Sequence, residues 1–314
     1  MKKILATLFA AALCLTCFAG CGGEENKIQT IDLGEGKTYV GEVVDGVPQG
    51  EGTLSDLLGS EWKGTFVDGK LQGWGTYVGY DLVEYEGQFV DGQFNGFGTC
   101  TYGNGDLYTG QFVNGKPEGV GRMEYTTGCY YEGGWKDGFM DGMGWMTWPV
   151  GDAYFGEWSK GTPAGFGCKV YYDASISSMK KGDYTTYNKY VGEMQNNLPH
   201  GEGIMYFQGS GGIYFGAWDE GTRDDDWAIY YFEPGIDCVK FEGAFSATKN
   251  GGWIWGYGTM WYSDGRIVTG TWEGQTCVEV ESETNGNVET VTAQAAALAA
   301  SLNDTVNSTV GTIG

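Results

Sequence analysis

The 314-residue chain has few of the residues from which most active sites are built. It has one histidine, His200, so only this residue could serve as the base of a Ser-His or Cys-His catalytic pair. It has 18 basic against 41 acidic residues and a formal net charge of −23. Nucleic-acid phosphates and anionic lipid headgroups would therefore repel the protein. Its longest apolar run, residues 4–15, is shorter than the roughly twenty residues that span a bilayer. These scarcities disfavour a nucleic-acid-binding protein, an integral membrane protein and a histidine-dependent enzyme.

The N-terminal residues have the layout of a bacterial export signal. Lys2 and Lys3 precede the apolar run, and Phe18-Ala19-Gly20-Cys21 follows it. The last four resemble a lipoprotein lipobox, whose cysteine receives a diacylglyceryl group. We therefore expect residues 1–20 to be removed and Cys21 to be lipidated, with plain secretion as the alternative. Residues 21–38 would form a tether on the extracytoplasmic face, in contact with the membrane only through the lipid.

Neither the cysteines nor the carboxylates form a pattern typical of a metal site. Five of the eight cysteines lie outside the signal and the lipid site, and they are odd in number and widely spaced: Cys100, Cys129, Cys168, Cys238 and Cys277. The densest acidic group, residues 224–226, lacks the alternating oxygen ligands and the turn glycine of a calcium loop. We predict no metal and no cofactor.

Glycine, in contrast, is abundant and recurs at a fixed interval. The chain has 57 glycines, and aromatic residues spaced by 23 begin units of the pattern aromatic-x-Gly-x-apolar-x-x-Gly-x-x-x-Gly-x-Gly: Tyr39, Trp62, Tyr85, Tyr108, Tyr131 and Tyr154. An insertion at about residues 173–189 interrupts the phase. Tyr190, Tyr214 and Phe241 begin three further units, and Val268 opens a half-unit that the sequence leaves incomplete. We count nine and a half units.

Each unit has the properties of a β-hairpin. Counting its first aromatic residue as position 0, positions 0, 2 and 4 share one face of a strand because side chains alternate. Asp-Gly or Asn-Gly pairs such as Asp91-Gly92 then supply the positive φ angles of a tight turn. On the returning strand, position 15 is apolar except at Lys169: Leu54, Tyr77, Cys100, Met123, Met146, Lys169, Met205, Ile229 and Met260. Position 17 is aromatic from the third unit onward, up to Tyr231 and Tyr262. We predict one apolar face, with Cys100 as a packed thiol.

These recurring residues resemble the repeat of the membrane occupation and recognition nexus (MORN) family over residues 39–275. The resemblance implies an all-β fold: an elongated, single-layer antiparallel sheet in which each repeat is one hairpin. In this family, catalytic activity sits in a separate attached domain. After the array, this chain has only the tail of residues 276–314.

The tail has a different composition from the array. Glycine becomes scarce, and apolar residues recur at helical spacing: Val288, Val291, Ala295, Leu298 and Leu302. We predict a short helix over about residues 287–302. Two roles stay open, a cap over the last hairpin or a docking helix for a partner.

Position 12 points to the face opposite the aromatic residues and is apolar in five consecutive units: Trp74, Phe97, Val120, Met143 and Phe166. We call this row the outer stripe. Contiguous exposed apolar surface often marks an interaction site. The alternatives are that loops or sheet twist cover these side chains, or that the two faces curl into a closed section.

The sequence therefore predicts a non-enzymatic scaffold that binds a protein partner, with no catalytic residue. The acidic surround favours a basic partner. A carbohydrate or cell-wall polymer is the alternative, because exposed aromatic rings also stack on sugars. Phospholipid binding, often linked to the family, ranks third because of the charge.

Overall fold

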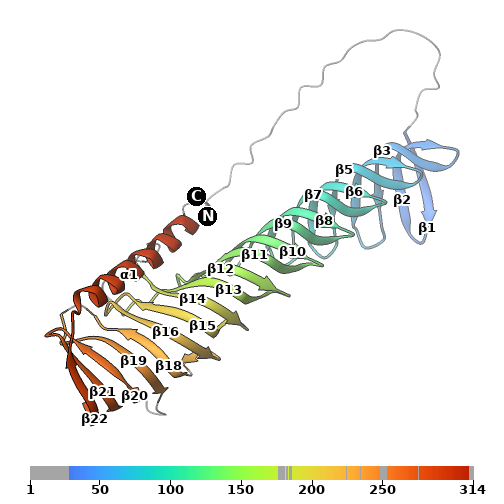
Figure 1. The fold of residues 1–314 in the computed structure, drawn as a ribbon. Helices are drawn as coiled ribbons and strands as arrows, with labels where there is room; N and C mark the ends of the chain where they lie inside the picture. Colours follow the sequence, from blue (N-terminus) through green and yellow to red (C-terminus); the bar gives the residue numbers. More distant parts are fainter. Residues whose placement is uncertain are drawn as a thin grey trace.

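A computed structural model describes residues 28–175, 181, 183, 186–223, 225–233, 235–247, 253–274 and 276–310. The predicted export signal, the lipid site at Cys21 and the acidic residue Asp224 lie outside this part of the chain. The described residues form one antiparallel sheet and one helix, arranged as a long ladder that is a single layer thick (Figure 1). The predicted fold class is confirmed.

The strands follow the order of the chain. Their bounds are β1 Ile28–Gly34, β2 Lys37–Val44, β3 Val47–Ser55, β4 Glu61–Val67, β5 Lys70–Val78, β6 Glu84–Val90, β7 Gln93–Thr101, β8 Leu107–Val113, β9 Lys116–Glu124, β10 Tyr130–Lys136, β11 Phe139–Thr147, β12 Ala153–Ser159, β13 Thr162–Tyr171, β14 Asn188–Gln195, β15 Leu198–Phe207, β16 Gly212–Asp219, β17 Thr222–Arg223, β18 Asp225–Tyr231, β19 Cys238–Ala247, β20 Trp253–Tyr262, β21 Arg266–Glu273 and β22 Thr276–Asn285; the helix is α1 Glu289–Val310. Each strand pairs with the next along the chain except β17, which pairs with β16 alone; β18 then pairs with both β16 and β19. At about 4.8 Å per strand, the ladder is on the order of 100 Å long.

The hairpin turns have the predicted conformation. At Asp91-Gly92 both residues have positive φ, 52° and 79°, as a two-residue type I′ turn requires. The turn glycine also links neighbouring hairpins, because the Gly92 N–H donates to the Leu71 carbonyl at 2.9 Å. The same bond recurs from Gly69 to Pro48 and from Gly115 to Phe94. The turns thus fix both the hairpin and its position against the preceding repeat.

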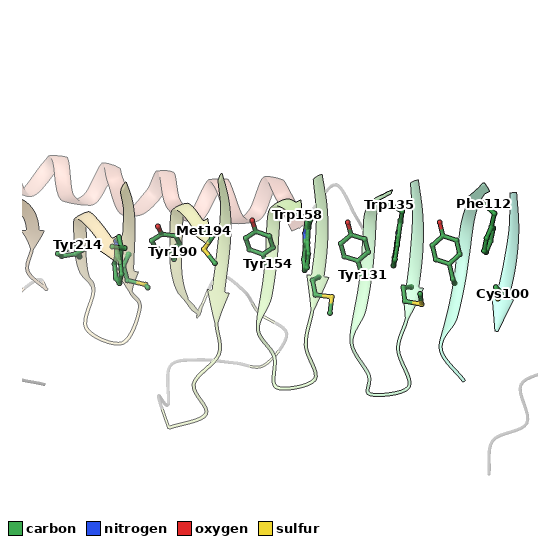
Figure 2. Close-up of a cluster of buried hydrophobic side chains, with 14 of the residues drawn as sticks. Cys100, Phe112, Tyr131, Trp135, Tyr154, Trp158, Tyr190, Met194 and Tyr214 are labelled. Carbon is green, nitrogen blue, oxygen red and sulfur yellow. The ribbon is translucent and has the colours of Figure 1, made fainter. Parts of the chain in front are cut away.

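The inner face holds the core, a ladder of aromatic rings (Figure 2). The ring at position 0 packs edge-on against the ring at position 4 of its own repeat and against that of the next. Tyr131, for example, lies 5.3 Å from Trp135 and 5.1 Å from Trp158, both in T-shaped geometry. Such pairs add stability beyond the area they bury. Nearest-neighbour ring contacts therefore hold consecutive repeats together.

Glycine pairs make room for the tyrosine of each repeat. Gly87 and Gly98, at positions 2 and 13, lie opposite each other, and a Cβ on either would overlap the Tyr85 side chain. The Tyr85 hydroxyl reaches across the pair and donates to the Gln88 carbonyl at 2.9 Å. Burial raises the pKa of Tyr85 to about 12. The glycines at these positions are therefore required by packing.

Most of the predicted column at position 15 is buried, including Cys100, whose packed thiol is confirmed; Leu54 and Tyr77 are half-buried. Lys169, the one polar member, is buried too. Its ammonium donates to the carbonyl and side-chain oxygens of Asn197 at 3.0 and 2.9 Å and lies 5.3 Å from the Tyr171 ring. Burial lowers the pKa of Lys169. These bonds and the ring contact compensate for placing a charge in this column.

The predicted register is wrong in the repeat that begins at Tyr214. Tyr230 lies opposite Tyr214, and Ile229, predicted for that place, lies opposite Phe215. Tyr230 is nine positions after Gly221, whereas Met123 is eight positions after Gly115. One extra residue moves every following side chain to the other face. Tyr230 and Phe232 consequently pack on the core in place of the predicted Ile229 and Tyr231.

The sheet extends beyond the predicted repeat array at both ends. Strand β1 lies within the predicted tether, residues 21–38, and pairs with β2. Strand β22 completes the hairpin that the sequence seemed to leave half-finished. Helix α1 is longer than predicted and contacts β19, where Val288 and Ala296 line a hollow with Val239. It therefore covers a strand upstream of the last hairpin, and its role in docking stays a prediction.

Candidate functional site

The outer stripe lies on the solvent side of the sheet. Its five side chains are between 53% and 66% exposed, and each stands on a strand that begins just after a hairpin turn, β5, β7, β9, β11 and β13. Most hairpins have a bulge between positions 2 and 4, and the stripe lies on the side of the sheet opposite the aromatic ladder. Neither loops nor sheet curvature cover the stripe. Its exposure is therefore a property of the fold, and its binding role stays a prediction.

A hollow of about 160 Å³ interrupts the stripe between Val120 and Met143. Most repeats carry Thr, Gln or Glu at position 3, whereas this repeat has Gly134 opposite Val120. Without that side chain, the rings of Trp145 and Phe155 line the hollow together with Glu132. The alternation of apolar residues does not predict this hollow; the Gly133-Gly134 doublet is the signal for it in the sequence.

Beyond the hollow, a second apolar cluster occupies the outer face. Its buried members are Trp145, Ala153, Cys168, Val170 and Tyr187, and Tyr187 comes from the predicted insertion. The Tyr187 ring lies 5.2 Å from that of Tyr172, and the Tyr187 carbonyl accepts a bond from the buried Lys189 ammonium at 2.9 Å. Burial lowers the pKa of Lys189 to about 8. Part of the outer face is thus covered by the chain itself, while Phe166 stays exposed.

The outer face is acidic. From β2 to β14, the outward positions 1, 3, 12 and 14 carry two basic residues, Lys63 and Arg122, against six glutamates: Glu42, Glu51, Glu86, Glu132, Glu157 and Glu193. Arg122 is already engaged, because it pairs with Glu124 at 2.8 Å and lies over the Tyr130 ring. A ligand on the stripe would therefore meet negative charge within the row, as at Glu157 opposite Met143, and beside it, as at Glu86 and Glu132.

The described residues contain no cluster of side chains that could hold a metal ion. His200 Nδ1 lies 3.3 Å from the Asp219 carboxylate of the next repeat, a link between repeats like the bond from Gln72 to Asp91. Within the described chain, the five cysteines are free thiols and no group of three metal-ligating side chains occurs. Burial raises the pKa of Cys100 to about 11 and that of Cys168 to about 12, which makes both thiols poor nucleophiles.

No helix in the described part of the chain has the length and apolarity to cross a bilayer. Comparison with solved structures finds the TCP10 domain of zebrafish (Danio rerio) CPAP in complex with a peptide of STIL, at 12% identity over 76% of this chain and 97% of that chain, with a TM-score of 0.38. A point mutant of the same zebrafish domain matches at 12% identity over 82% of this chain and 99% of that chain, with a TM-score of 0.26. No curated protein matches the chain in sequence.

The repeat pattern itself identifies the family. The MORN repeat profile matches eight segments that together cover more than half of the chain: residues 39–56, 62–81, 85–107, 108–130, 131–153, 154–175, 190–211 and 248–265. The segment between residues 211 and 248, where the register shifts, is outside these matches. The chain belongs to the MORN repeat family.

Proposed function

We propose that this protein is a non-enzymatic scaffold, tethered outside the cell by a lipid on Cys21, that binds a protein partner along its outer stripe. The observation that carries the proposal is the row of five large apolar side chains, each more than half exposed, on the face opposite the aromatic ladder. The aromatic ladder accounts for the apolar residues of the inner face through packing. It leaves those of the outer stripe without a structural role.

The composition of the stripe favours a protein over a sugar polymer. Trp74, Phe97 and Phe166 offer rings on which sugars can stack, but Val120 and Met143 between them do not. A mixed aromatic and aliphatic row is typical of protein interfaces, where a few buried apolar anchors supply most of the affinity. The surrounding glutamates would orient a basic partner.

The test compares two triple variants of the full-length protein in its own cells. W74S/F97S/F166S removes three stripe residues, and V67S/V90S/V113S removes three equally apolar side chains, 46% to 51% exposed, beside the hairpin turns. We expect protein adducts, measured by crosslinking and mass spectrometry, to fall about ten-fold in the first variant and to persist in the second. Unchanged adducts in the first variant, with its fold intact by circular dichroism, would refute the proposal.

A pulldown with purified cell-wall polymer and the same variants distinguishes carbohydrate binding from protein binding. If W74S/F97S/F166S loses sedimentation with purified cell wall while its protein adducts stay unchanged, the stripe binds carbohydrate. The tether is tested by metabolic labelling with a lipid precursor, which we expect to mark the wild type and not C21A.

A further inference from the structure

The outer stripe has a regular spacing that selects the conformation of its ligand. Successive stripe residues stand on every second strand, so they recur at about 9.6 Å. The row runs across the strands, along the length of the array. A linear chain bound along it would therefore meet one apolar contact every ~9.6 Å.

Among regular peptide conformations, polyproline II matches this interval most closely. Three residues of polyproline II advance about 9.3 Å and return to the same side of the helix. Two residues of a β-strand advance about 6.7 Å. Seven residues of an α-helix advance about 10.5 Å. Over the four intervals from Trp74 to Phe166, polyproline II drifts by roughly 1 Å, whereas the α-helix drifts by nearly 4 Å.

The chemistry of the stripe suits proline. Flat exposed rings such as those of Trp74 and Phe97 are the surfaces on which proline-rich segments dock, and a preformed polyproline II helix loses little entropy on binding. The hollow between Val120 and Met143 would admit one larger side chain between the rings of Trp145 and Phe155. Glu132 at the same hollow favours a cationic one.

We propose that the outer stripe binds a basic, proline-rich protein segment in the polyproline II conformation, with every third residue placed on successive stripe positions. This inference rests on the proposed function and specifies its partner by chemistry. The prolines would contact the stripe, and the basic residues between them would face glutamates within and beside the row, such as Glu157 opposite Met143 and Glu86 opposite Thr76.

The test uses three labelled peptides with the full-length protein in detergent, followed by fluorescence anisotropy. Each peptide has five copies of one triplet, Pro-Pro-Arg, Gly-Gly-Arg or Ala-Ala-Arg. The net charge and the sequence spacing of the arginines are therefore the same in all three, while the backbone is polyproline II, flexible or helical. We expect Pro-Pro-Arg to bind about ten-fold more tightly than either control. The variant W74S/F97S/F166S should lose about ten-fold in affinity, V67S/V90S/V113S should stay within about two-fold, and E86Q/E132Q/E157Q should reduce the salt dependence.

Equal affinity for the three peptides would overturn the inference, because charge alone would then account for binding. Undiminished affinity in W74S/F97S/F166S, or no binding of Pro-Pro-Arg, would overturn it too. If the crosslinks in cells disappear in the stripe variant while the peptides fail, the scaffold function stands and only the polyproline II ligand is wrong. If the peptides fail and the crosslinks in cells are unchanged in the stripe variant, the outer stripe is not a protein-binding site.

Discussion

Two insertions in this array have opposite consequences. The insertion at about residues 173–189 adds thirteen residues to the 23-residue spacing between Tyr154 and Tyr190. It leaves the register unchanged, because Lys169 pairs with Tyr190 as Met146 pairs with Tyr154. The single extra residue between Gly221 and Tyr230 shifts the pairing. The first falls in a loop and the second within the returning strand. Where a residue is added therefore matters more than how many are added.

The shifted repeat also departs from the pattern before its extra residue, where β17 still pairs with β16 in the ordinary register. Position 9, which is Pro, Leu, Phe or Met in earlier repeats, becomes Arg223, whose guanidinium lies between the rings of Phe207 and Tyr214 at 5.0 and 4.8 Å. Burial lowers the pKa of Arg223 to about 10. Ring contacts of this kind let the ladder continue through an irregular repeat.

The largest expected effect comes from moving a strand insertion into the regular half. One glycine inserted between Gly121 and Arg122 should turn the inner side chains of β9 outward and destabilise the protein by several kcal/mol. Five Gly/Ser residues inserted after Thr127, in the loop between β9 and β10, should cost less than about 1 kcal/mol. Urea unfolding followed by tryptophan fluorescence measures both, and similar costs for the two would contradict the comparison.

The second effect is alkaline unfolding. Burial raises the pKa of Tyr108, Tyr131 and Tyr154 above the ordinary value of 10.0. Their stabilisation is complete below pH 10 and is lost as the pH rises above it, because the unfolded chain releases these protons first. Absorbance at 295 nm should therefore rise together with unfolding. Y108F/Y131F/Y154F should move the midpoint to higher pH, since Phe241 already occupies position 0; an unmoved midpoint would refute this.

A third effect is local to the glycine pairs. Gly98→Ala places a Cβ against the Tyr85 ring and should cost about 3 kcal/mol. Gly92→Ala, the matched control, has no atom within 4 Å and should cost about 1 kcal/mol for its positive φ of 79°. Equal free energies of unfolding for the two variants would mean that the Tyr85 packing is not the reason for Gly98.

The smallest expected effect is at Leu82. It has a φ of 66° in the loop position that Gly59, Gly105 and Gly128 occupy in neighbouring repeats, and its side chain is largely exposed. Leu82→Gly should relieve the strain and stabilise the protein by roughly 0.5–1 kcal/mol. Gly105→Leu should destabilise by a similar amount, and thermal melts check the sign of each change.

The sequence predicts the fold best in the repeats that have glycines at fixed positions. Turn pairs such as Asp91-Gly92 and the glycine pairs beneath each tyrosine have steric requirements that are visible in the sequence. The hairpins, their strand register and the column at position 15 could therefore be predicted from these glycines. Strands β1 and β22 lack the paired glycines beneath an aromatic ring, and no glycine marks the 23-residue spacing between Gly221 and Tyr230. Their pairing depends on the edge or strand already formed beside them, which the local sequence does not encode.

The same contrast holds on the outer face. Alternation predicted the position and exposure of Trp74, Phe97 and Phe166. It did not predict the cluster around Trp145 and Tyr187, because that cluster forms only when a segment from the insertion folds back onto β12 and β13. Contacts between distant segments leave no periodic signal.

The central claim is that the outer stripe, and not the turn edge, meets the partner. A photoreactive phenylalanine analogue at position 97 or at position 90, on neighbouring strands of similar exposure, tests it directly in cells. The account predicts protein adducts from position 97, few from position 90, and loss of the former when Trp74 and Phe166 are changed to Ser. Adducts in equal yield from both positions, or from position 90 alone, would contradict it.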